Sequence, residues 1–227
     1  MDFGRPVGVA HPLYIIAVLD CRELGTLDRA IAAVDAAANS TVDAIKLDRM
    51  PWAWSAKLIA RAEARSIALF ATALDEDAVT RLDWLGANAF YLVFDWSDLD
   101  LVAAAARTGK PVVMQVGTAS EIELAEVVAT VHAHGKGGIA LVQSVIDVDL
   151  EGLAALQRHG SVVGIADRSA GPAIPLAAIS KGASIVEKRF SLRKEDRTLC
   201  PVEVSRVVRD CEQAWALLGS DRRWAFN

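Results

Sequence analysis

The sequence predicts an α/β protein with the (β/α)8 TIM-barrel fold, and three observations support this prediction. Short apolar runs recur along the chain and start roughly 22 to 30 residues apart. The stretches between them have the spacing of helices that are apolar on one side. A chain of 227 residues also has the length of this fold near the small end of its range.

The apolar runs predict the strands. Most are apolar at nearly every position, which is typical of parallel strands that are covered on both faces. In chain order we expect strands at Tyr14–Leu19, Ala44–Leu47, Ile67–Ala71, Phe90–Phe94, Val112–Val116, Ile139–Val142, Val162–Ala166 and Ile185–Glu187.

The segments between the runs predict the helices. Leu27–Ala38, Ile122–His132 and Pro201–Leu218 carry apolar residues at helical spacing. Asp75 and Ser120 are suited to begin helices, because a short polar side chain can accept from the first free backbone N–H groups. Glycines stand where helices are expected to end before the next strand: Gly86, Gly109, Gly135 and Gly182.

A doubly wound open sheet is the alternative architecture. Such sheets usually carry a glycine-rich phosphate turn after the first strand, and residues 20–25 read DCRELG without that fingerprint. No interior stretch reads as a Gly-, Ser- or Pro-rich linker. We therefore expect residues 1–227 to form a single barrel domain.

Composition narrows the classes of partner. The chain has 24 Lys and Arg against 29 Asp and Glu, a net charge of −5, which argues against nucleic acid or an anionic membrane as the main partner. Its apolar runs are too short for a membrane helix, and its N-terminus lacks a signal pattern. The 3 cysteines show no CxxC spacing. We therefore expect a cytoplasmic protein whose partner is a small metabolite.

Polar residues gather at the carboxyl ends of the predicted strands, where barrel enzymes place their active sites. They predict either an anion-binding mouth or a buried salt-bridge network, and the two can coexist. The residues are Asp20, Lys46, Asp48, Thr72, Asp95, Gln115, Gln143, Ser144, Asp167, Arg168, Lys188 and Arg189.

Several short motifs resemble the sialic acid (N-acetylneuraminate) synthase family. Residues 164–171 read GIADRSAG and residues 185–191 read IVEKRFS, similar to the family's G-x-S-D-H-T-x-G and I-E-K-H-F-T. Upstream, DAIK (43–46), LFATALD (69–75), TGKPV (108–112) and LVQS (141–144) resemble D-A-V-K, F-x-S-T-P-F-D, T-G-K-P-V and L-L-Q-C. The resemblance implies a (β/α)8 barrel that condenses phosphoenolpyruvate with an N-acyl amino sugar, using a divalent metal.

The chain departs from that family at its metal site. The two metal-binding histidines of the family correspond to Arg168 and Arg189, and a third family histidine matches Arg197, after Asp196. A guanidinium keeps its proton and has no lone pair to donate to a metal. We therefore expect no metal and no other cofactor.

Other departures concern the substrate. Tyr91 and Phe94 stand where the resemblance places a phosphate-binding lysine and serine, and Gln115 replaces another serine. The family's second, antifreeze-like domain, which reaches the partner subunit's site, is expected to be absent. Family positions that are retained are Lys46, Thr72, Asp167, Lys188 and Asp196.

These arguments select the site residues. Arg and Lys favour carboxylate and phosphate, so a small anionic ligand is expected. The residues expected to bind it are Lys46, Thr72, Gln115, Gln143, Arg168, Lys188, Arg189, Asp196 and Arg197. The candidate catalytic residues are Asp20, Lys46, Asp167 and Lys188.

Aromatic and thiol side chains leave alternatives open. Trp52, Trp54 and Trp96 follow predicted strands and either line the site or form the interface of a homodimer. Cys21 ends the first strand; packing is the favoured interpretation, and a nucleophile beside basic residues is the alternative.

Two function classes remain. The first is an enzyme that forms or breaks a C–C or C–O bond of a phosphorylated or carboxylated substrate, with arginines in place of the metal. A Schiff-base aldolase that uses Lys46 or Lys188 is a variant of it. The second is a non-catalytic relative that serves as a ligand-binding or subunit-assembly module. A functional acid or base would distinguish them.

Overall fold

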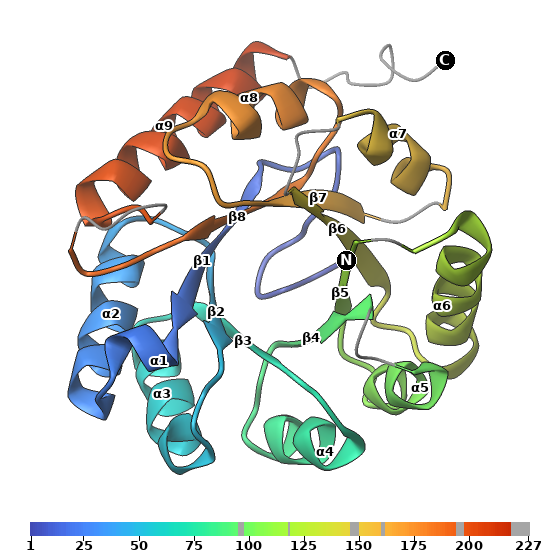
Figure 1. Cartoon of the computed structure of the whole chain (residues 1–227), viewed down its shortest axis with the longest axis horizontal. Helices are drawn as coiled ribbons and strands as arrows, with labels where there is room; N and C mark the ends of the chain where they lie inside the picture. The colour runs from blue at the N-terminus through green and yellow to red at the C-terminus, as the bar shows by residue number, and fades with distance from the viewer. Residues whose placement is uncertain (95–97, 118, 146–149, 160–161, 194–197, 219–227) are drawn as a thin grey trace.

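A computed structural model describes residues 1–94, 98–117, 119–145, 150–159, 162–193 and 198–218. Eight parallel strands close into a barrel in chain order, and helices surround it (Figure 1). This confirms the predicted (β/α)8 fold and excludes the open sheet. The strands are β1 (Tyr14–Asp20), β2 (Ala44–Asp48), β3 (Ala68–Thr72), β4 (Ala89–Val93), β5 (Val112–Val116), β6 (Ile139–Val145), β7 (Val162–Asp167) and β8 (Ile185–Arg189).

Helices follow the strands and cover the outside of the barrel. They are α1 (Cys21–Leu24), α2 (Leu27–Asn39), α3 (Trp52–Ala64), α4 (Glu76–Trp84), α5 (Leu99–Arg107), α6 (Glu121–His134), α7 (Glu151–Gln157), α8 (Ala173–Ser180) and α9 (Pro201–Leu217). Among the described residues, no helix combines the length and apolar character needed to cross a membrane.

The ends of the helices follow from local chemistry. The Asp75 carboxylate accepts from the Ala78 backbone N–H at 2.7 Å, and Ser120 forms a capping box with Glu123. Gly135 ends α6 in an extended conformation, and a Cβ there would lie 2.1 Å from the Ala106 carbonyl oxygen. Glycine is therefore required at this position by the close approach of two backbones.

Six of the eight strands end one to three residues later than predicted, whereas β5 ends at the predicted residue and β4 ends one residue earlier. Asp20 still pairs with Asp48 between β1 and β2, and Val18 pairs with Arg189 between β1 and β8. Backbone pairing thus continues after the side chains become polar. This extension places ionisable side chains on the strands themselves, at the carboxyl ends of a closed barrel.

The core has two layers. Side chains that point outward pack between the strands and the helices, including Leu47, Leu69 and Val186. Side chains that point inward fill the barrel, including Tyr14 and Phe70. Alternation along each strand therefore assigns every residue to one layer or the other.

The N-terminal segment closes one end of the barrel. Phe3 is fully buried and makes edge-on ring contacts with Tyr14 and Phe70. The Tyr14 hydroxyl donates to the Phe3 carbonyl at 3.0 Å. Described residues thus fill this end, which leaves the carboxyl ends of the strands as the side from which we expect a ligand to enter.

Candidate active site

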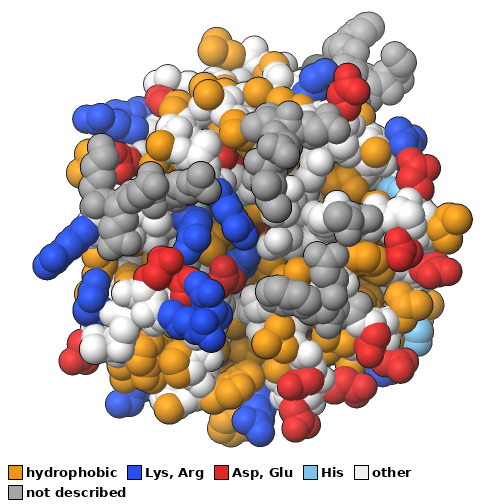
Figure 2. All heavy atoms as spheres, viewed as in Figure 1, with side chains coloured by type: hydrophobic (Ala, Val, Ile, Leu, Met, Phe, Trp, Pro, Cys, Tyr) orange, Lys and Arg blue, Asp and Glu red, His pale blue; other side chains and the backbone are white. Residues whose placement is uncertain are grey.

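A cavity of about 700 Å³ opens at the carboxyl ends of the strands. On this face, Lys, Arg, Asp and Glu side chains gather around a hollow near the middle of the view (Figure 2). Ionisable side chains line one part of the cavity: Asp20, Lys46, Asp48, Arg49, Asp75, Asp167, Arg168, Glu187 and Arg189. Both charge signs are present, as expected where an anion-binding mouth and a salt-bridge network coexist.

Strand alternation decides which side chains reach the cavity. On β8, Glu187 and Arg189 point inward with Ile185, whereas Lys188 points outward. On β2, Lys46 and Asp48 share the inward face. Glu187 is not among the site residues expected from the sequence, although its spacing of two from Arg189 was the signal that both share one face.

Lys46 forms the centre of the cavity floor. Its ammonium lies 3.2 Å from Glu187 Oε2, 3.5 Å from Asp48 Oδ1 and 3.7 Å from the centre of the Tyr91 ring. These contacts combine two ion pairs with a cation–π interaction. The charge of Lys46 is thus offset within the protein, which weakens its predicted role as an anion-binding cation.

Glu187 is the most deeply buried carboxylate of the cavity, with 1% of its side chain exposed. Its Oε2 accepts from Lys46, while its Oε1 has no hydrogen-bond partner among the described residues. Burial raises the pKa of Glu187, and the neighbouring Lys46 acts in the opposite direction. A buried carboxylate with one open oxygen in a cavity can exchange a proton or a hydrogen bond with a ligand.

Tyr91 and Gln115 form the adjoining part of the floor. The Tyr91 hydroxyl donates to Gln115 Oε1 at 3.1 Å, and Tyr91 itself is fully buried. Burial raises the pKa of Tyr91 well above its ordinary value, so the phenol stays protonated and acts as a donor. Gln115 lies at the cavity as predicted, with its amide oxygen turned to Tyr91.

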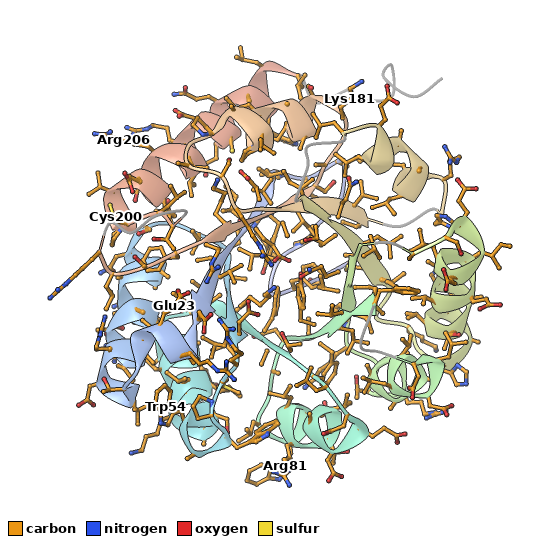
Figure 3. All side chains as sticks on the ribbon, viewed as in Figure 1. Glu23, Trp54, Arg81, Lys181, Cys200 and Arg206 are labelled. Carbon is orange, nitrogen blue, oxygen red and sulfur yellow. The ribbon has the colours of Figure 1, made fainter. Side chains whose placement is uncertain are left out.

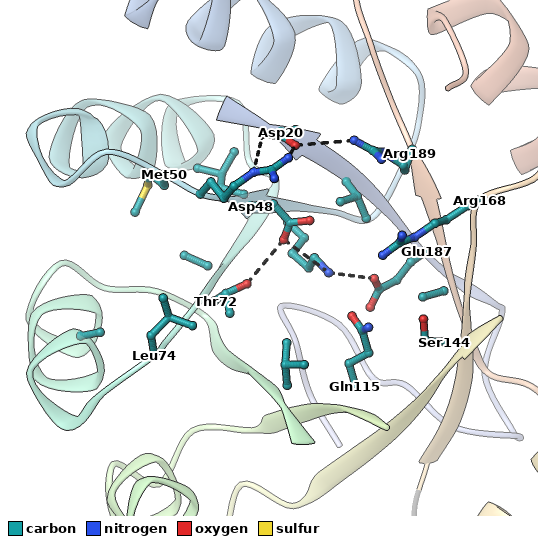
Figure 4. Close-up of a pocket in the computed structure, with 18 of the residues that line it drawn as sticks. Asp20, Asp48, Met50, Thr72, Leu74, Gln115, Ser144, Arg168, Glu187 and Arg189 are labelled. Carbon is teal, nitrogen blue, oxygen red and sulfur yellow. Dashed lines mark hydrogen bonds and ion pairs between the residues drawn. The ribbon is translucent and has the colours of Figure 1, made fainter. Parts of the chain in front are cut away.

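Asp20 is held by contacts on several sides. Its carboxylate accepts from the Arg22 backbone N–H at 3.0 Å and from Arg49 Nε at 3.1 Å. Arg189 Nη2 lies 3.6 Å from Asp20 Oδ2 and 2.8 Å from Glu23 Oε1. Asp20 therefore orients two arginines at the rim, and Arg189 reaches the cavity with its charge already paired (Figure 4).

Arg49 is a rim residue that the sequence did not single out. It follows β2 with a φ of +54°, a left-handed conformation that is costly for a long side chain. Its guanidinium pairs with Asp20, and half of its side chain is exposed. The ion pair compensates part of the backbone strain and keeps the guanidinium at the mouth.

Arg168 differs from the other cavity arginines. It follows β7, lines the cavity and forms no ion pair with a described residue. Figure 4 shows its guanidinium directed into the cavity beside Glu187. An unpaired guanidinium can offer two parallel N–H groups to a carboxylate or phosphate.

Lys188, a predicted catalytic and anion-binding residue, does not line the cavity. Its ammonium donates to Asp167 Oδ2 at 2.7 Å and to the carbonyl oxygens of Ser169 at 2.7 Å and Gly171 at 3.1 Å. All three N–H groups are used, so the prediction of an anion site at Lys188 is corrected. The residue holds the loop between β7 and α8.

Asp167 shares this structural contact. Besides Lys188, its carboxylate accepts from the backbone N–H of Ser169 at 2.7 Å and the Ser169 hydroxyl at 3.1 Å. Asp167 borders the cavity but is 1% exposed. Its predicted catalytic role loses support, because its oxygens are occupied by the loop.

Gln143, expected to bind the ligand, points to the outer layer. Its neighbours Val142 and Ser144 face the barrel, and a Cβ at Gly152 of α7 would lie 2.4 Å from its amide nitrogen. The expectation failed because polarity at a strand end does not reveal the direction of a side chain. Ser144 takes the inward position instead.

Thr72 lies at the cavity as expected, with its hydroxyl 3.5 Å from Asp48 Oδ1. The predicted ligand-binding residues Asp196 and Arg197 lie outside the described residues, and so do Asp95 and Trp96.

The other tryptophans occupy different surroundings. Trp52 lines the cavity, is 42% exposed and lies under the Arg81 guanidinium at 5.4 Å. Trp54 packs against the outer core on α3, where Figure 3 shows it beside the helix. Only Trp52 of this pair can therefore contact a ligand in the cavity.

Cys21 does not have the surroundings of a nucleophile. Burial raises its pKa to about 11, and the Asp48 charge adds to this effect. The thiolate, which is the reactive form, is thereby disfavoured. Packing explains this residue.

The described residues do not fit a divalent metal. They contain no group of three or more His, Cys, Asp or Glu side chains placed to hold an ion. Arg168 and Arg189 instead place guanidiniums at the cavity. No catalytic step is therefore derived through a metal.

Comparison with known proteins provides an independent line of evidence. The NeuB family model matches residues 27–223. A pseudaminic acid synthase of Helicobacter pylori is 29% identical over 157 residues, which are 65% of this chain and 46% of that protein. The spore coat polysaccharide biosynthesis protein SpsE of Bacillus subtilis is 25% identical over 234 residues, covering 84% of this chain and 63% of that protein. The chain thus spans less than two thirds of the length of each of these relatives, 46% of the first and 63% of the second.

Solved structures agree in fold. The crystal structure of SpsE from Bacillus subtilis superposes with a TM-score of 0.83 at 25% identity, covering 93% of this chain and 70% of that one. A sialic acid synthetase from Leptospira borgpetersenii, in complex with citrate, gives a TM-score of 0.84 at 23% identity, covering 96% and 92%.

Proposed function

Because this chain belongs to the NeuB family, as the match over residues 27–223 shows, we propose that it is a sugar-acid enzyme of carbohydrate biosynthesis. Its cavity takes a small phosphorylated or carboxylated substrate and forms or breaks a C–C or C–O bond of it. The names of the relatives, synthases of pseudaminic acid and a polysaccharide biosynthesis protein, support this chemistry.

The observation that carries the proposal is the guanidinium of Arg168, which lines a cavity of about 700 Å³ and forms no ion pair with a described residue. Arginine binds carboxylate and phosphate more directionally than lysine, because its planar fork matches their two oxygens. The other cationic groups at the cavity are already paired: Lys46 with Glu187 and Asp48, and Arg49 and Arg189 with Asp20. Arg168 is therefore the group we assign to the anionic end of the substrate.

Glu187 is the acid or base we assign to the reaction. The earlier candidates Asp20 and Asp167 use their oxygens in contacts within the protein, whereas Glu187 keeps Oε1 open. Burial also raises the pKa of Glu187, which favours proton exchange closer to neutral pH than an exposed carboxylate allows.

The reaction we propose proceeds without a divalent metal. Fixed guanidiniums stabilise negative charge that develops on a substrate oxygen, which is the electrostatic part of a metal's role. Schiff-base chemistry is disfavoured, because the Nζ atoms of Lys46 and Lys188 are both engaged in ion pairs with buried carboxylates.

The test measures turnover of metal-stripped protein. Phosphoenolpyruvate is offered with a series of aldoses, and 2-oxo sugar acids are offered in the cleavage direction, with products followed by NMR in excess EDTA. We expect turnover that falls at least about a hundredfold in Glu187→Gln, in the range of general acid–base effects. Turnover that appears only with added manganese would contradict the metal-free proposal.

A ligand-binding module is the second candidate function. The observation that favours it is that Asp20, Asp167 and Lys188 serve the fold rather than the cavity. Saturable binding of the same anions, with no turnover of any tested combination, would establish this function instead of the enzyme.

A further inference from the structure

The cavity floor presents an acceptor and a donor that no described residue satisfies. Glu187 Oε1 is a buried acceptor with no hydrogen-bond partner among the described residues. Gln115 lies beside it at the cavity (Figure 4), and its Oε1 accepts from Tyr91. The amide group of Gln115 is thereby oriented, and its Nε2, for which no described residue is an acceptor, remains as the donor.

Tyr91 determines which end of the Gln115 amide faces the cavity as a donor. Its raised pKa keeps the phenol protonated, and its hydroxyl donates to the glutamine oxygen at 3.1 Å, which turns the amide nitrogen of Gln115 away from Tyr91. Lys46 acts in the same way on the carboxylate, because its ammonium occupies Glu187 Oε2 and leaves Oε1. Two fully buried neighbours thus fix a donor and an acceptor that lie side by side in the floor.

A ligand hydroxyl is complementary to such a pair, since its oxygen accepts from an amide N–H while its O–H donates to a carboxylate. A phosphate is not, because it would place an oxygen with negative charge against Glu187 Oε1. A buried acceptor left unpaired costs free energy, so a site of this kind discriminates against a ligand that lacks the hydroxyl.

We propose that the floor formed by Glu187 and Gln115 binds a hydroxyl group of the substrate, and that Arg168 binds its carboxylate. The substrate class is therefore a hydroxylated carboxylic acid, with its hydroxyl bound by Glu187 and Gln115 and its carboxylate bound by Arg168. This inference rests on the proposed function, from which it takes the role of Arg168 as the anion site.

The test compares two acids that differ by one hydroxyl. Citrate and tricarballylate carry the same three carboxylates, and only citrate has the hydroxyl. We expect isothermal titration calorimetry at neutral pH to give a dissociation constant at least about tenfold lower for citrate. Equal affinity for the two acids overturns the hydroxyl site and leaves the anion site intact, whereas no binding of either acid overturns both.

Substitutions assign the discrimination to the floor. In Glu187→Gln the Lys46 ammonium retains the amide oxygen, so an N–H₂ donor replaces the open acceptor. The ratio of the tricarballylate dissociation constant to the citrate dissociation constant should fall to about one. Tricarballylate itself should bind as well as before or more tightly, because the substitution removes a negative charge. Glu126→Gln on exposed α6 makes the same change outside the cavity and should keep the full ratio.

Tyr91→Phe provides a second variant, which retains the ring over Lys46. Without the phenol, the Gln115 amide is free to turn, and the ratio should fall at least about threefold. If both variants keep the wild-type ratio of dissociation constants, Glu187 and Gln115 do not bind the hydroxyl of citrate, and their role is confined to the fold.

Discussion

Arg168 is the residue on which anion binding depends most directly, because its guanidinium enters the cavity without an ion pair to a described residue. Sulfate or phosphate at about 100 times its dissociation constant should stabilise the protein by roughly 2.7 kcal/mol. For a domain of this size that corresponds to a rise in melting temperature of roughly 5–10 °C. We expect Arg168→Met to remove this rise when unfolding is followed by differential scanning fluorimetry.

Two further variants show whether the effect is specific to Arg168. Arg189→Met should reduce the rise only in part, because that guanidinium is already paired with Asp20 and Glu23. Arg158→Met removes an exposed arginine that pairs with Glu121 on the surface and should leave the rise unchanged. A full response in Arg168→Met would place the anion elsewhere.

Lys188 is expected to matter for stability rather than for binding. Lys188→Met leaves the buried Asp167 carboxylate without its cation and two carbonyl oxygens without a donor. Breaking such a buried pair costs roughly 3–5 kcal/mol of unfolding free energy. Urea denaturation followed by circular dichroism should show this loss.

The partner substitution tests that explanation. Combining Lys188→Met with Asp167→Asn removes the uncompensated charge and should recover part of the loss. An unfolding free energy of Lys188→Met within about 1 kcal/mol of wild type would show that the ion pair contributes little.

At the scale of elements, the contact between β7 and β8 depends on Gly164. A Cβ on this residue would lie 2.6 Å from both the carbonyl oxygen and the Cβ of Ile185. Because the obstacle includes backbone, the strands themselves must separate. We expect Gly164→Ala to lower the unfolding free energy by roughly 1–3 kcal/mol in urea titrations.

Gly152 on α7 supplies the matched control. There the added Cβ would approach the end of the Gln143 side chain, which can move aside. Gly152→Ala also places a better helix former in a helix. It should therefore change stability by less than about 0.5 kcal/mol, and a loss equal to that of Gly164→Ala would show that contact with backbone is not the deciding factor.

At the scale of the whole molecule, we expect little synthesis of N-acetylneuraminate from phosphoenolpyruvate and N-acetylmannosamine. Tyr91 stands where the resemblance places a phosphate-binding lysine. It is fully buried, and its ring lies against the Lys46 ammonium. Misplacement of a substrate by about 1 Å can lower a rate roughly a hundredfold. Arg168 and Arg189 stand where the resemblance places metal-binding histidines, so we expect a second contribution of several kcal/mol, that of the metal, to be lost.

The assay compares this protein with a NeuB relative that keeps the histidines, with and without manganese. Elemental analysis of the purified protein should find no stoichiometric manganese, magnesium or zinc. Turnover within about tenfold of the relative, or one tightly bound metal per chain, would show that the arginines do not replace the metal site.

The eight strands and the alternation of strands with helices were predictable from the sequence. Apolar runs recur at strand-helix spacing, and burial on both faces of a parallel strand leaves this pattern in the sequence. Capping by Asp75 and Ser120 was also predictable, because it depends on residues within one helical turn. The motifs around residues 164–171 and 185–191 indicated the family, which the match over residues 27–223 shows.

The tertiary structure decided which polar side chains form the site. Lys188 and Glu187 are adjacent in sequence, yet only Glu187 points into the barrel. Closure of β1 against β8 brings Asp20 and Arg189 together, so Arg189 is paired, whereas Arg168 has no ion-pair partner in the described part of the chain. Strand direction and ion pairing depend on contacts between segments far apart in the chain, and for this reason the order of residues alone does not reveal them.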